Sequence, residues 1–446
     1  MNRSANGRIV SLEARSSSES ESLNKNMKLL LIGNFLMTLN RSVTRGNLPE
    51  YISFLGGDLS SWGLMATVGT LFNIAAIVPA GIIGDAIGRI KILYTLGLLN
   101  VICAYLVAAA TTWEWIFPGY IAFELQQGIF LPIAIAMISD TIADEEEVRN
   151  IKKLTRIRML TYFELSSVVG SSIGFLITSL YFFLVGDVYT LPLLRGNMLI
   201  GFLFSIIVFV SILFFKDSGK LESMEKRPVL LQKAPSSRTN EILIISGFGV
   251  SSFLIGLGAG FFIPFSQPFW SQEFHLSPVA INIILGTSFL CVSIGTALLP
   301  TLSRMFSRTQ ITLLTQGLAI PLILVIAWSP LIYVVLPTFL VRSALMNVSR
   351  PVQQALLQRG IDSSFRATGQ SISSLADRVG RGITPAFASL VIIELGFKIS
   401  FTITAFFYLV AIVVLYLMIA TFDLDPKRKL AESNSKTTRT SPLIDY

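Results

Sequence analysis

The sequence predicts an all-α, polytopic membrane protein with twelve transmembrane helices in two pseudo-symmetric six-helix bundles. The first reason is composition: hydrophobic residues occupy 52% of 446 positions, charged residues 14%, and the mean hydropathy is +0.67, more apolar than a soluble domain. The second is that apolar runs recur at about 20 residues, the length with which a helix crosses a bilayer. The third is a long polar stretch that separates six runs from six.

The predicted spanning segments follow one another with short loops. In chain order they are residues 28–47, 61–83, 91–111, 115–138, 157–184, 193–215, 241–267, 278–303, 310–328, 331–357, 367–396 and 399–422. They define an N-terminal bundle over 27–215 and a C-terminal bundle over 241–422.

The polar stretch at 216–240 contains Pro228, Pro235 and paired serines, a composition typical of a linker. We expect a cytoplasmic linker there. Residues 1–26 are polar and serine-rich without an apolar core, which predicts a disordered cytoplasmic tail rather than a cleaved signal peptide. Residues 423–446 are predicted to form a second cytoplasmic tail.

Basic residues gather before the first segment and in every second loop, with Lys398 as the one clear exception. Because cytoplasmic loops are enriched in lysine and arginine, this pattern places both termini in the cytoplasm. We expect the protein in the plasma membrane. The net charge of +8 is spread over loops and tails rather than over one face, so topology explains it better than a nucleic-acid partner does.

A weak repeat relates the two predicted bundles. Pro132 and Pro351 lie 219 positions apart, and the same offset connects one inter-helix loop of each half, from Gly81, Asp85 and Arg89 to Pro300, Arg304 and Arg308. Two related halves with cytoplasmic termini are typical of carriers, in which the substrate site lies where the halves meet near mid-membrane.

The loop between the second and third segments has the most specific pattern, with Gly81, Asp85, Gly88, Arg89 and Lys91 in the sequence GIIGDAIGRIK. Glycines permit close helix approach and a tight turn, the aspartate can meet a helix N-terminus or an arginine, and the two basic residues stay in cytoplasmic water. This loop resembles the signature loop of the major facilitator superfamily.

The resemblance implies alternating access, with this loop closing the cytoplasmic side and Arg149 as a partner for Asp85. The corresponding loop of the second half has Arg304 and Ser307 in place of the acid and the glycine, so only one strong latch is expected. The alternative is that the motif only shapes a loop and follows the charge rule.

Patterns of individual subfamilies match less well. Glu124 stands four residues before Gly128, where drug exporters carry arginine, and Phe175 replaces a proline of the antiporter pattern that begins at Gly170. The sugar-porter signature after the sixth segment is missing.

Polar residues on single helix faces indicate a substrate cavity. In the first segment they are Asn34, Thr38, Arg41 and Arg45, spaced four, three and four residues apart. Arg41 lies about 20 Å from the cytoplasmic helix end, at the depth of Glu124, and Gln127 follows one turn later. We expect an ion pair between Arg41 and Glu124 that substrate or protonation breaks; a permanent structural salt bridge is the alternative.

The second half supplies the remaining candidates. Asn347 and Gln354 share one face of the tenth segment, and Arg342 lies on an adjacent strip. Asp377 precedes Arg381 by one helical turn and can neutralise it. Because buried carboxylates often bind transported protons, Glu124, Glu164 and Asp377 are the candidates for proton coupling.

The functional prediction is a secondary transporter of a small molecule, first of all a proton-coupled exporter of an amphipathic compound. Uptake of an organic anion through a cavity lined by Arg41 and Arg342 is the alternative, and a membrane receptor or scaffold is the alternative outside transport.

Cys103, Cys291 and His275 cannot form a metal or thiol cluster, so no catalytic residue, metal or cofactor is predicted. Glutamates and arginines alone leave a membrane-embedded enzyme open. The predicted partners are the small-molecule substrate, protons and the lipid bilayer, and the chain is predicted to be a monomer without a nucleic-acid partner.

Overall fold

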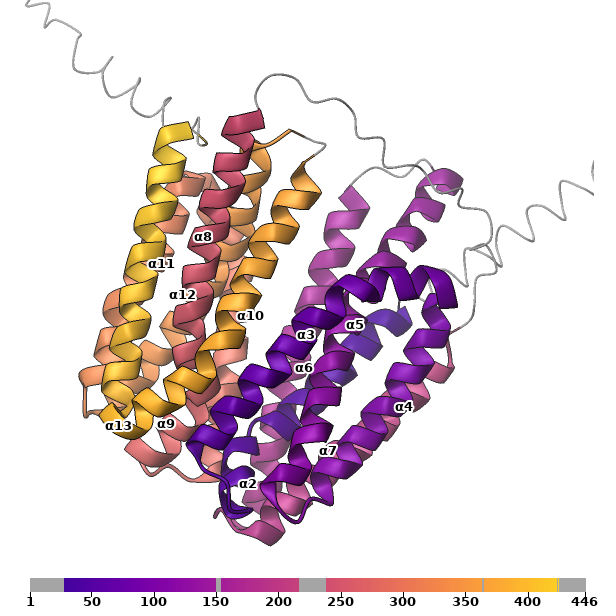
Figure 1. The fold of residues 1–446 in the computed structure, drawn as a ribbon, viewed down its shortest axis with the longest axis vertical. Helices are drawn as coiled ribbons and strands as arrows, with labels where there is room; N and C mark the ends of the chain where they lie inside the picture. Colours follow the sequence, from indigo (N-terminus) through magenta and orange to yellow (C-terminus); the bar gives the residue numbers. More distant parts are fainter. Residues whose placement is uncertain (1–27, 150–153, 216–237, 363–364, 423, 425–446) are drawn as a thin grey trace, which may run out of the picture. The chain divides into compact units, whose positions relative to one another are not determined.

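The computed structural model describes residues 28–149, 154–215, 238–362, 365–422 and 424, and every regular element within them is a helix (Figure 1). Nine stretches of these residues are long and apolar enough to cross a membrane. One of these stretches, at residues 368–422, contains two successive helices. The predicted all-helical membrane class is confirmed, and the helices are compatible with the predicted twelve crossings.

The first half follows the predicted segments closely. Its elements are a helix over 28–45, α2 Leu48–Phe54, α3 Leu59–Ile87, α4 Arg89–Ala108, α5 Trp113–Arg149, α6 Leu154–Val185 and α7 Leu191–Leu213. The short α2 was expected to be a loop; Pro49 at its first turn has a backbone suited to starting a helix. Helix α5 ends at Arg149 rather than at residue 138, because its charged last turns include the three successive helix-forming glutamates at 145–147.

The second half contains two interrupted segments. Its elements are α8 Arg238–Phe262, η1 Ile263–Phe265, α9 Ser266–Glu273, α10 Pro278–Met305, α11 Arg308–Trp328, α12 Ile332–Gly360 and α13 Arg366–Phe422. Pro264 cannot donate a backbone hydrogen bond, and a short 3-10 turn replaces the α-helix there. Within α13, Gly396 has a φ of 80° and ends one helix and begins the next, as the predicted eleventh and twelfth segments require.

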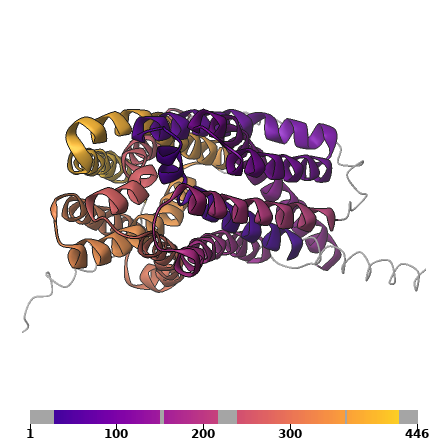
Figure 2. The ribbon, with the colours of Figure 1, turned by 90° about the horizontal axis from the view of Figure 1, so that it is seen from below.

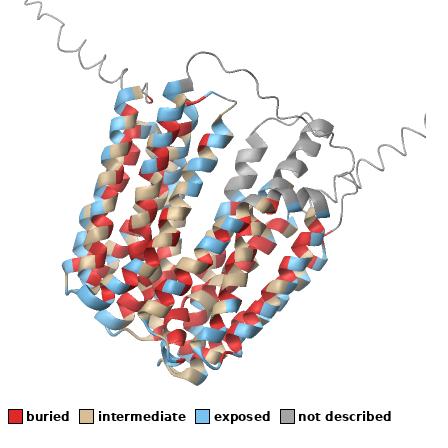
Figure 3. Cartoon of the chain, in the orientation of Figure 1, coloured by how far each residue is buried: buried red, intermediate tan, exposed pale blue. Residues whose placement is uncertain are grey.

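The chain forms two compact units. Unit 1 comprises Met1–Leu230 and Trp270–Gly286, and unit 2 comprises Leu231–Phe269 and Thr287–Tyr446. Each has its own apolar cluster, around Leu93, Phe130 and Phe163 in unit 1 and around Phe248, Leu356 and Leu415 in unit 2. Figure 2 gives a second view of the helices, and Figure 3 shows buried and exposed residues alternating along them. Many of the exposed residues are large and apolar, as expected for helices that meet lipid.

Residues 270–286 belong to unit 1 although they follow α8 in the chain. The side chain of Asn282 donates to Asn47 Oδ1 at 3.2 Å, and the hydroxyl of Ser172 donates to the carbonyl of Gly286 at 2.9 Å. The amide of Val279 donates to Asp187 at 2.9 Å. The sequence contains no periodic signal for this association, and the bundle boundaries read from the sequence remain a prediction.

Helices α4 and α11, which follow the two related loops, begin at different kinds of residue. Gly88 precedes α4 with a φ of 97°, a backbone conformation that favours glycine. Ser307 occupies the equivalent place before α11, where its hydroxyl accepts from the amide of Gln310 in a capping box. The serine that departs from the signature motif is therefore a helix cap.

Candidate functional site

Unit 1 contains a cluster of charges around Glu124. Arg45 Nη1 lies 2.9 Å and Arg41 Nη2 lies 3.4 Å from Oε1 of Glu124, whose side chain is only 3% exposed. The expected ion pair of Arg41 and Glu124 is present, but Arg45 makes the shorter contact. One carboxylate thus serves two guanidinium groups, and the cluster carries a net positive charge.

Two further side chains hold this cluster in place. The amide of Asn73, on α3, donates to Glu124 Oε2 at 3.3 Å and to the Glu124 carbonyl at 2.9 Å. Tyr120, one turn before Glu124 on α5, accepts from Arg45 Nη2 at 2.8 Å. The backbones of α3 and α5 meet closely here, since a Cβ at Gly128 would overlap the carbonyl of Asn73. Glu124 is therefore fixed by packing as well as by charge.

A cavity of about 30 Å³ lies beside the two arginines and is lined by Asn40, Thr44, Cys103 and Tyr120 among others. This volume holds about one or two waters and is too small for an organic substrate. Asn40, one of the lining residues, has a buried Oδ1 without a hydrogen-bond partner in the structure.

Of the other cavity residues predicted in the first half, Asn34 forms hydrogen bonds to a neighbouring helix. Asn34 donates to the carbonyl of Phe163 at 2.8 Å and to Ser166 Oγ at 2.9 Å, both on α6. Thr38 donates to the carbonyl of Asn34 in its own helix at 2.9 Å, and Gln127 is half-buried on α5. These contacts explain helix packing, and a role of the three residues in binding substrate stays a prediction.

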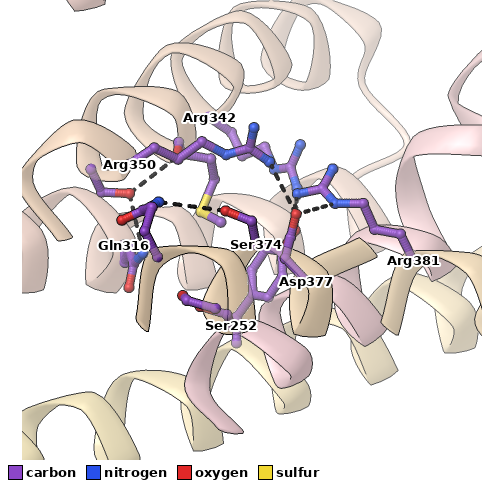
Figure 4. Close-up of polar contacts among 12 residues, drawn as sticks. Ser252, Gln316, Arg342, Arg350, Ser374, Asp377 and Arg381 are labelled. Atoms are coloured by element: carbon purple, nitrogen blue, oxygen red, sulfur yellow. Dashed lines mark hydrogen bonds and ion pairs between the residues drawn. The ribbon is translucent and has the colours of Figure 1, made fainter. Parts of the chain in front are cut away.

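Unit 2 has a second charge cluster, centred on Asp377 of α13 (Figure 4). Arg381 donates to both carboxylate oxygens, each at 3.0 Å, and Arg350 Nη2 lies 3.8 Å from Oδ2. The expected neutralisation of Asp377 by Arg381 is present. As in unit 1, one carboxylate contacts two arginines.

The backbone at Asp377 is positioned by glycines. A Cβ at Gly256 of α8 would overlap the carbonyl oxygen of Asp377, and one at Gly380 would overlap the carbonyl oxygen of Phe253. Small residues allow helices to approach this closely in membranes. Gly256 and Gly380 thus form a close contact between α8 and α13 at Asp377.

Arg342 of α12 lies in an aromatic setting without an acid. Its Nη2 donates to the hydroxyl of Tyr408 at 2.9 Å, and its guanidinium carbon lies 4.1 Å from the ring centre of Phe262. The residue is 4% exposed, and its Nε has no hydrogen-bond partner. Among the described residues, no carboxylate forms an ion pair with it.

The remaining candidates of the second half lie apart from Arg342. Asn347 donates to the carbonyl of Ser343 in its own helix at 2.9 Å, and Gln354 is exposed. Glu164, the third candidate for proton coupling, is also exposed. Gln316 of α11, which the sequence did not suggest, donates to Ser349 at 3.1 Å within the buried part of unit 2. Roles of Asn347, Gln354 and Glu164 in transport stay predictions.

The predicted cytoplasmic latch is only partly described. Gly88 caps α4, Arg89 is half-buried and Lys91 is exposed. Gly81 lies within α3. The side chains of Asp85 and Arg149 lie outside the described part of the structure, so their pairing stays a prediction. Within the described part of the chain, no three His, Cys, Asp or Glu residues are grouped to hold a metal ion.

Several residues of the two clusters were not predicted from the sequence. Tyr120 was detectable, because it precedes Glu124 by one helical turn on the same face. Asn73, Phe262 and Tyr408 were not, since each lies on a different helix from the charge it contacts and a polar or aromatic residue in an apolar run has no preferred direction in the sequence alone. Gln126, fully buried without a partner for either amide atom, is a further polar residue without a sequence signal.

Comparison with known proteins agrees with this architecture. The Major Facilitator Superfamily matches residues 30–246 and 248–445. A bacterial homolog of the human lysosomal transporter Spinster, crystallised in an inward-facing and unoccupied conformation, is similar in fold with a TM-score of 0.69 at 13% identity, over 90% of this chain and 98% of the other.

Two further solved structures are similar. The nucleoside transporter NupG has a TM-score of 0.69 at 16% identity, over 88% of this chain and 99% of its own. The human organic anion transporter TETRAN has a TM-score of 0.58 at 14% identity, over 88% of this chain and 99% of its own. Among curated protein sequences there is no match.

The family match spans nearly the whole chain, and the described helices, the charge clusters within them and the solved structures of similar fold are consistent with it. The chain therefore belongs to the major facilitator superfamily and is a membrane transporter of small molecules.

Proposed function

We propose that this transporter carries a small organic anion. The observation that supports the proposal is the buried Arg342, together with two charge clusters in which two arginines contact one carboxylate. Arg41 and Arg45 share Glu124, whereas Arg350 and Arg381 share Asp377. Arg342 adds a further positive charge to unit 2 without a described acidic partner.

Charged arginines within a membrane carry a cost in free energy. Charges within the hydrocarbon region are costly and are found where they meet a partner, a cavity or a ligand. One carboxylate can pair with two arginines in a structural cluster, whereas Arg342 is buried and forms no ion pair with a carboxylate among the described residues. A substrate with an acidic group would compensate the charge of Arg342, and this favours the organic-anion alternative over a neutral or cationic substrate.

The names of the similar structures are compatible with this proposal. One of them is described as an organic anion transporter and another as a nucleoside transporter. The low sequence identity means that these names support a small-molecule substrate more than any particular compound.

Counterflow in proteoliposomes tests the proposal. Vesicles that contain the purified full chain and an excess of unlabelled compound are given labelled benzoate, succinate, uridine or tetraphenylphosphonium. We expect accumulation of a carboxylate and a clear loss of it in Arg41→Gln, while the exposed Arg308→Gln serves as the matched control. Exchange of uridine or the lipophilic cation without any carboxylate exchange would refute an anionic substrate.

Proton-coupled export of an amphipathic compound is the second candidate. It is supported by Glu124, a carboxylate that is 3% exposed and contacts two arginines, because protonation would release both of them for a conformational change. The test is substrate efflux driven by an imposed pH gradient. If Glu124→Gln keeps full activity and full dependence on the gradient, Glu124 does not couple transport to protons.

The proposal includes the orientation of the chain in the membrane and its oligomeric state. The alternation of basic loops supports an orientation with both termini in the cytoplasm, and the proposal places the protein in the plasma membrane as a monomer. Single cysteines introduced near residues 10 and 440 of a chain lacking Cys103 and Cys291 are expected to react only with a membrane-permeant reagent. Labelling of one end by an impermeant reagent in intact cells would contradict this orientation, and a dimer-sized particle in nanodiscs would contradict the monomer.

A further inference from the structure

Arg342 and Tyr408 present two hydrogen-bond donors without acceptors. Arg342 Nη2 donates to the Tyr408 hydroxyl at 2.9 Å. A tyrosine hydroxyl has one proton and accepts through its lone pairs, so this contact leaves the Tyr408 proton available for another group. The Nε of Arg342, on the same planar guanidinium, has no partner either. Within the described residues, no other side chain receives these two protons.

The two donors are held rigidly. Phe262 of α8 covers one face of the Arg342 guanidinium at 4.1 Å, and its ring packs against Phe401 at 4.6 Å and against Phe339 at 6.0 Å. An arginine over an aromatic face is attracted by the ring quadrupole. The guanidinium is therefore oriented by three helices before any ligand arrives.

The ring of Tyr408 occupies a space that a glycine provides. A Cβ at Gly258 of α8 would lie 2.7 Å from Cε1 of Tyr408, too close for a carbon contact. With Tyr408 only 2% exposed, its hydroxyl is fixed next to Arg342. Gly258 is thus a packing requirement for the position of that hydroxyl.

The local charge favours an anion. Both oxygens of Asp377 accept from Arg381, so this carboxylate is already occupied. A buried guanidinium with an unsatisfied N–H is unfavourable unless an acceptor binds to it.

We propose that Arg342 Nε–H and Tyr408 O–H form a binding site for the oxyanion group of the substrate, a carboxylate in particular. The inference rests on the proposed transport of organic anions and assigns the acidic group of the substrate to unit 2. The carboxylate accepts one hydrogen bond from each donor, and the buried surroundings strengthen both because they exclude water. Phe262 and Gly258 are positioning residues for the two donors.

Binding of benzoate to the purified full chain tests the site. The apparent Kd is obtained from the benzoate dependence of thermal unfolding, with benzamide as a ligand of the same shape but without charge. Arg342→Lys keeps the positive charge and removes Nε–H, while Tyr408→Phe keeps the ring and removes the hydroxyl. The matched controls are Arg308→Lys and Tyr333→Phe, which make the same two changes at exposed residues.

We expect each site variant to raise the Kd for benzoate about tenfold or more, since one hydrogen bond to a charged group is lost. The controls should stay within about twofold of the wild type. Should Arg342→Lys fail to fold, Tyr408→Phe alone decides, because it leaves the packing against Gly258 unchanged. Absence of a benzoate effect, an equal effect of benzamide, or unchanged binding in Tyr408→Phe would overturn the site.

Counterflow measured on the same preparations separates the site from the proposed function. Carboxylate exchange that is equal in wild type, Arg342→Lys and Tyr408→Phe supports transport of anions and overturns this site. Benzoate binding that depends on Arg342 and Tyr408, without exchange of any carboxylate by the wild type, supports the site and refutes the proposed substrate class.

Discussion

Replacement of Gly256 by alanine should separate α8 from α13 at the position of Asp377. The new Cβ would lie 3.0 Å from the carbonyl carbon of Asp377 and 3.1 Å from its Cα, whereas carbon atoms in contact are about 3.5–4.0 Å apart. The helices must therefore move apart by about 0.5–1 Å to remove the overlap. Overpacking of this kind costs about 1–3 kcal/mol.

The displacement should also weaken polar contacts next to Gly256. The hydroxyls of Ser252 and Ser373 are 2.7 Å apart across α8 and α13, and separation of the helices lengthens this hydrogen bond directly. The pair of Asp377 with Arg381 lies within one helix and should persist. We expect lower stability with the internal ion pair retained.

The assay is chemical unfolding of the purified protein, with Gly317→Ala as the matched control. A Cβ at Gly317 on α11 meets no atom within 4 Å, so that variant gains only the higher helix propensity of alanine, about 1 kcal/mol. Both variants share this gain, and the difference between their unfolding free energies isolates the packing cost. Equal stability of Gly256→Ala and Gly317→Ala would refute the close approach of α8 and α13.

Three further changes test individual contacts. Glu124→Gln leaves two arginines without their carboxylate and should lower the unfolding free energy by about 1–3 kcal/mol, less than for a fully buried pair because both arginines are about one-third exposed; an unchanged thermal midpoint would contradict this. Asp58→Ala removes the cap of α3 and should cost about 0.5–2 kcal/mol. Hydrogen bonds from the Ser60 hydroxyl and the Ser61 amide lower the pKa of Asp58, so its contribution is complete above the usual aspartate pKa and should vanish as the pH falls through the lowered value; a difference that persists in acid would argue against the cap. Ser307→Ala should cost about 1 kcal/mol and speed amide exchange in the first turn of α11, and unchanged exchange would disprove the capping box.

Much of the fold could be predicted from the sequence because lipid imposes a simple rule on the chain. A helix of about 20 apolar residues is the solution for each crossing, and the predicted segments match the helices to within a few residues at most ends. The exceptions have local causes. Helix α2 is too short to produce an apolar period, and the last turns of α5 extend beyond the apolar run because good helix formers continue it.

The candidate site was only partly predictable. Depth along two helices was enough to bring Arg41 and Glu124 together, but both Arg41 and Arg45 lie on the same face, and side-chain geometry gives Arg45 the shorter contact. The environment of Arg342 depends on the rotation of three helices. One sequence does not determine those rotations, because a helix face that meets lipid and a helix face that packs against protein are both apolar.

The most direct measurement of the central claim is a cryo-EM map of the full chain in nanodiscs with the carboxylate that counterflow identifies. We expect the acidic group of this ligand to lie within about 2.7–3.2 Å of a donor on Arg342, Arg381, Arg41 or Arg45. A bound and transported ligand whose acidic group contacts none of these arginines would contradict the claim that their surplus charge holds the substrate.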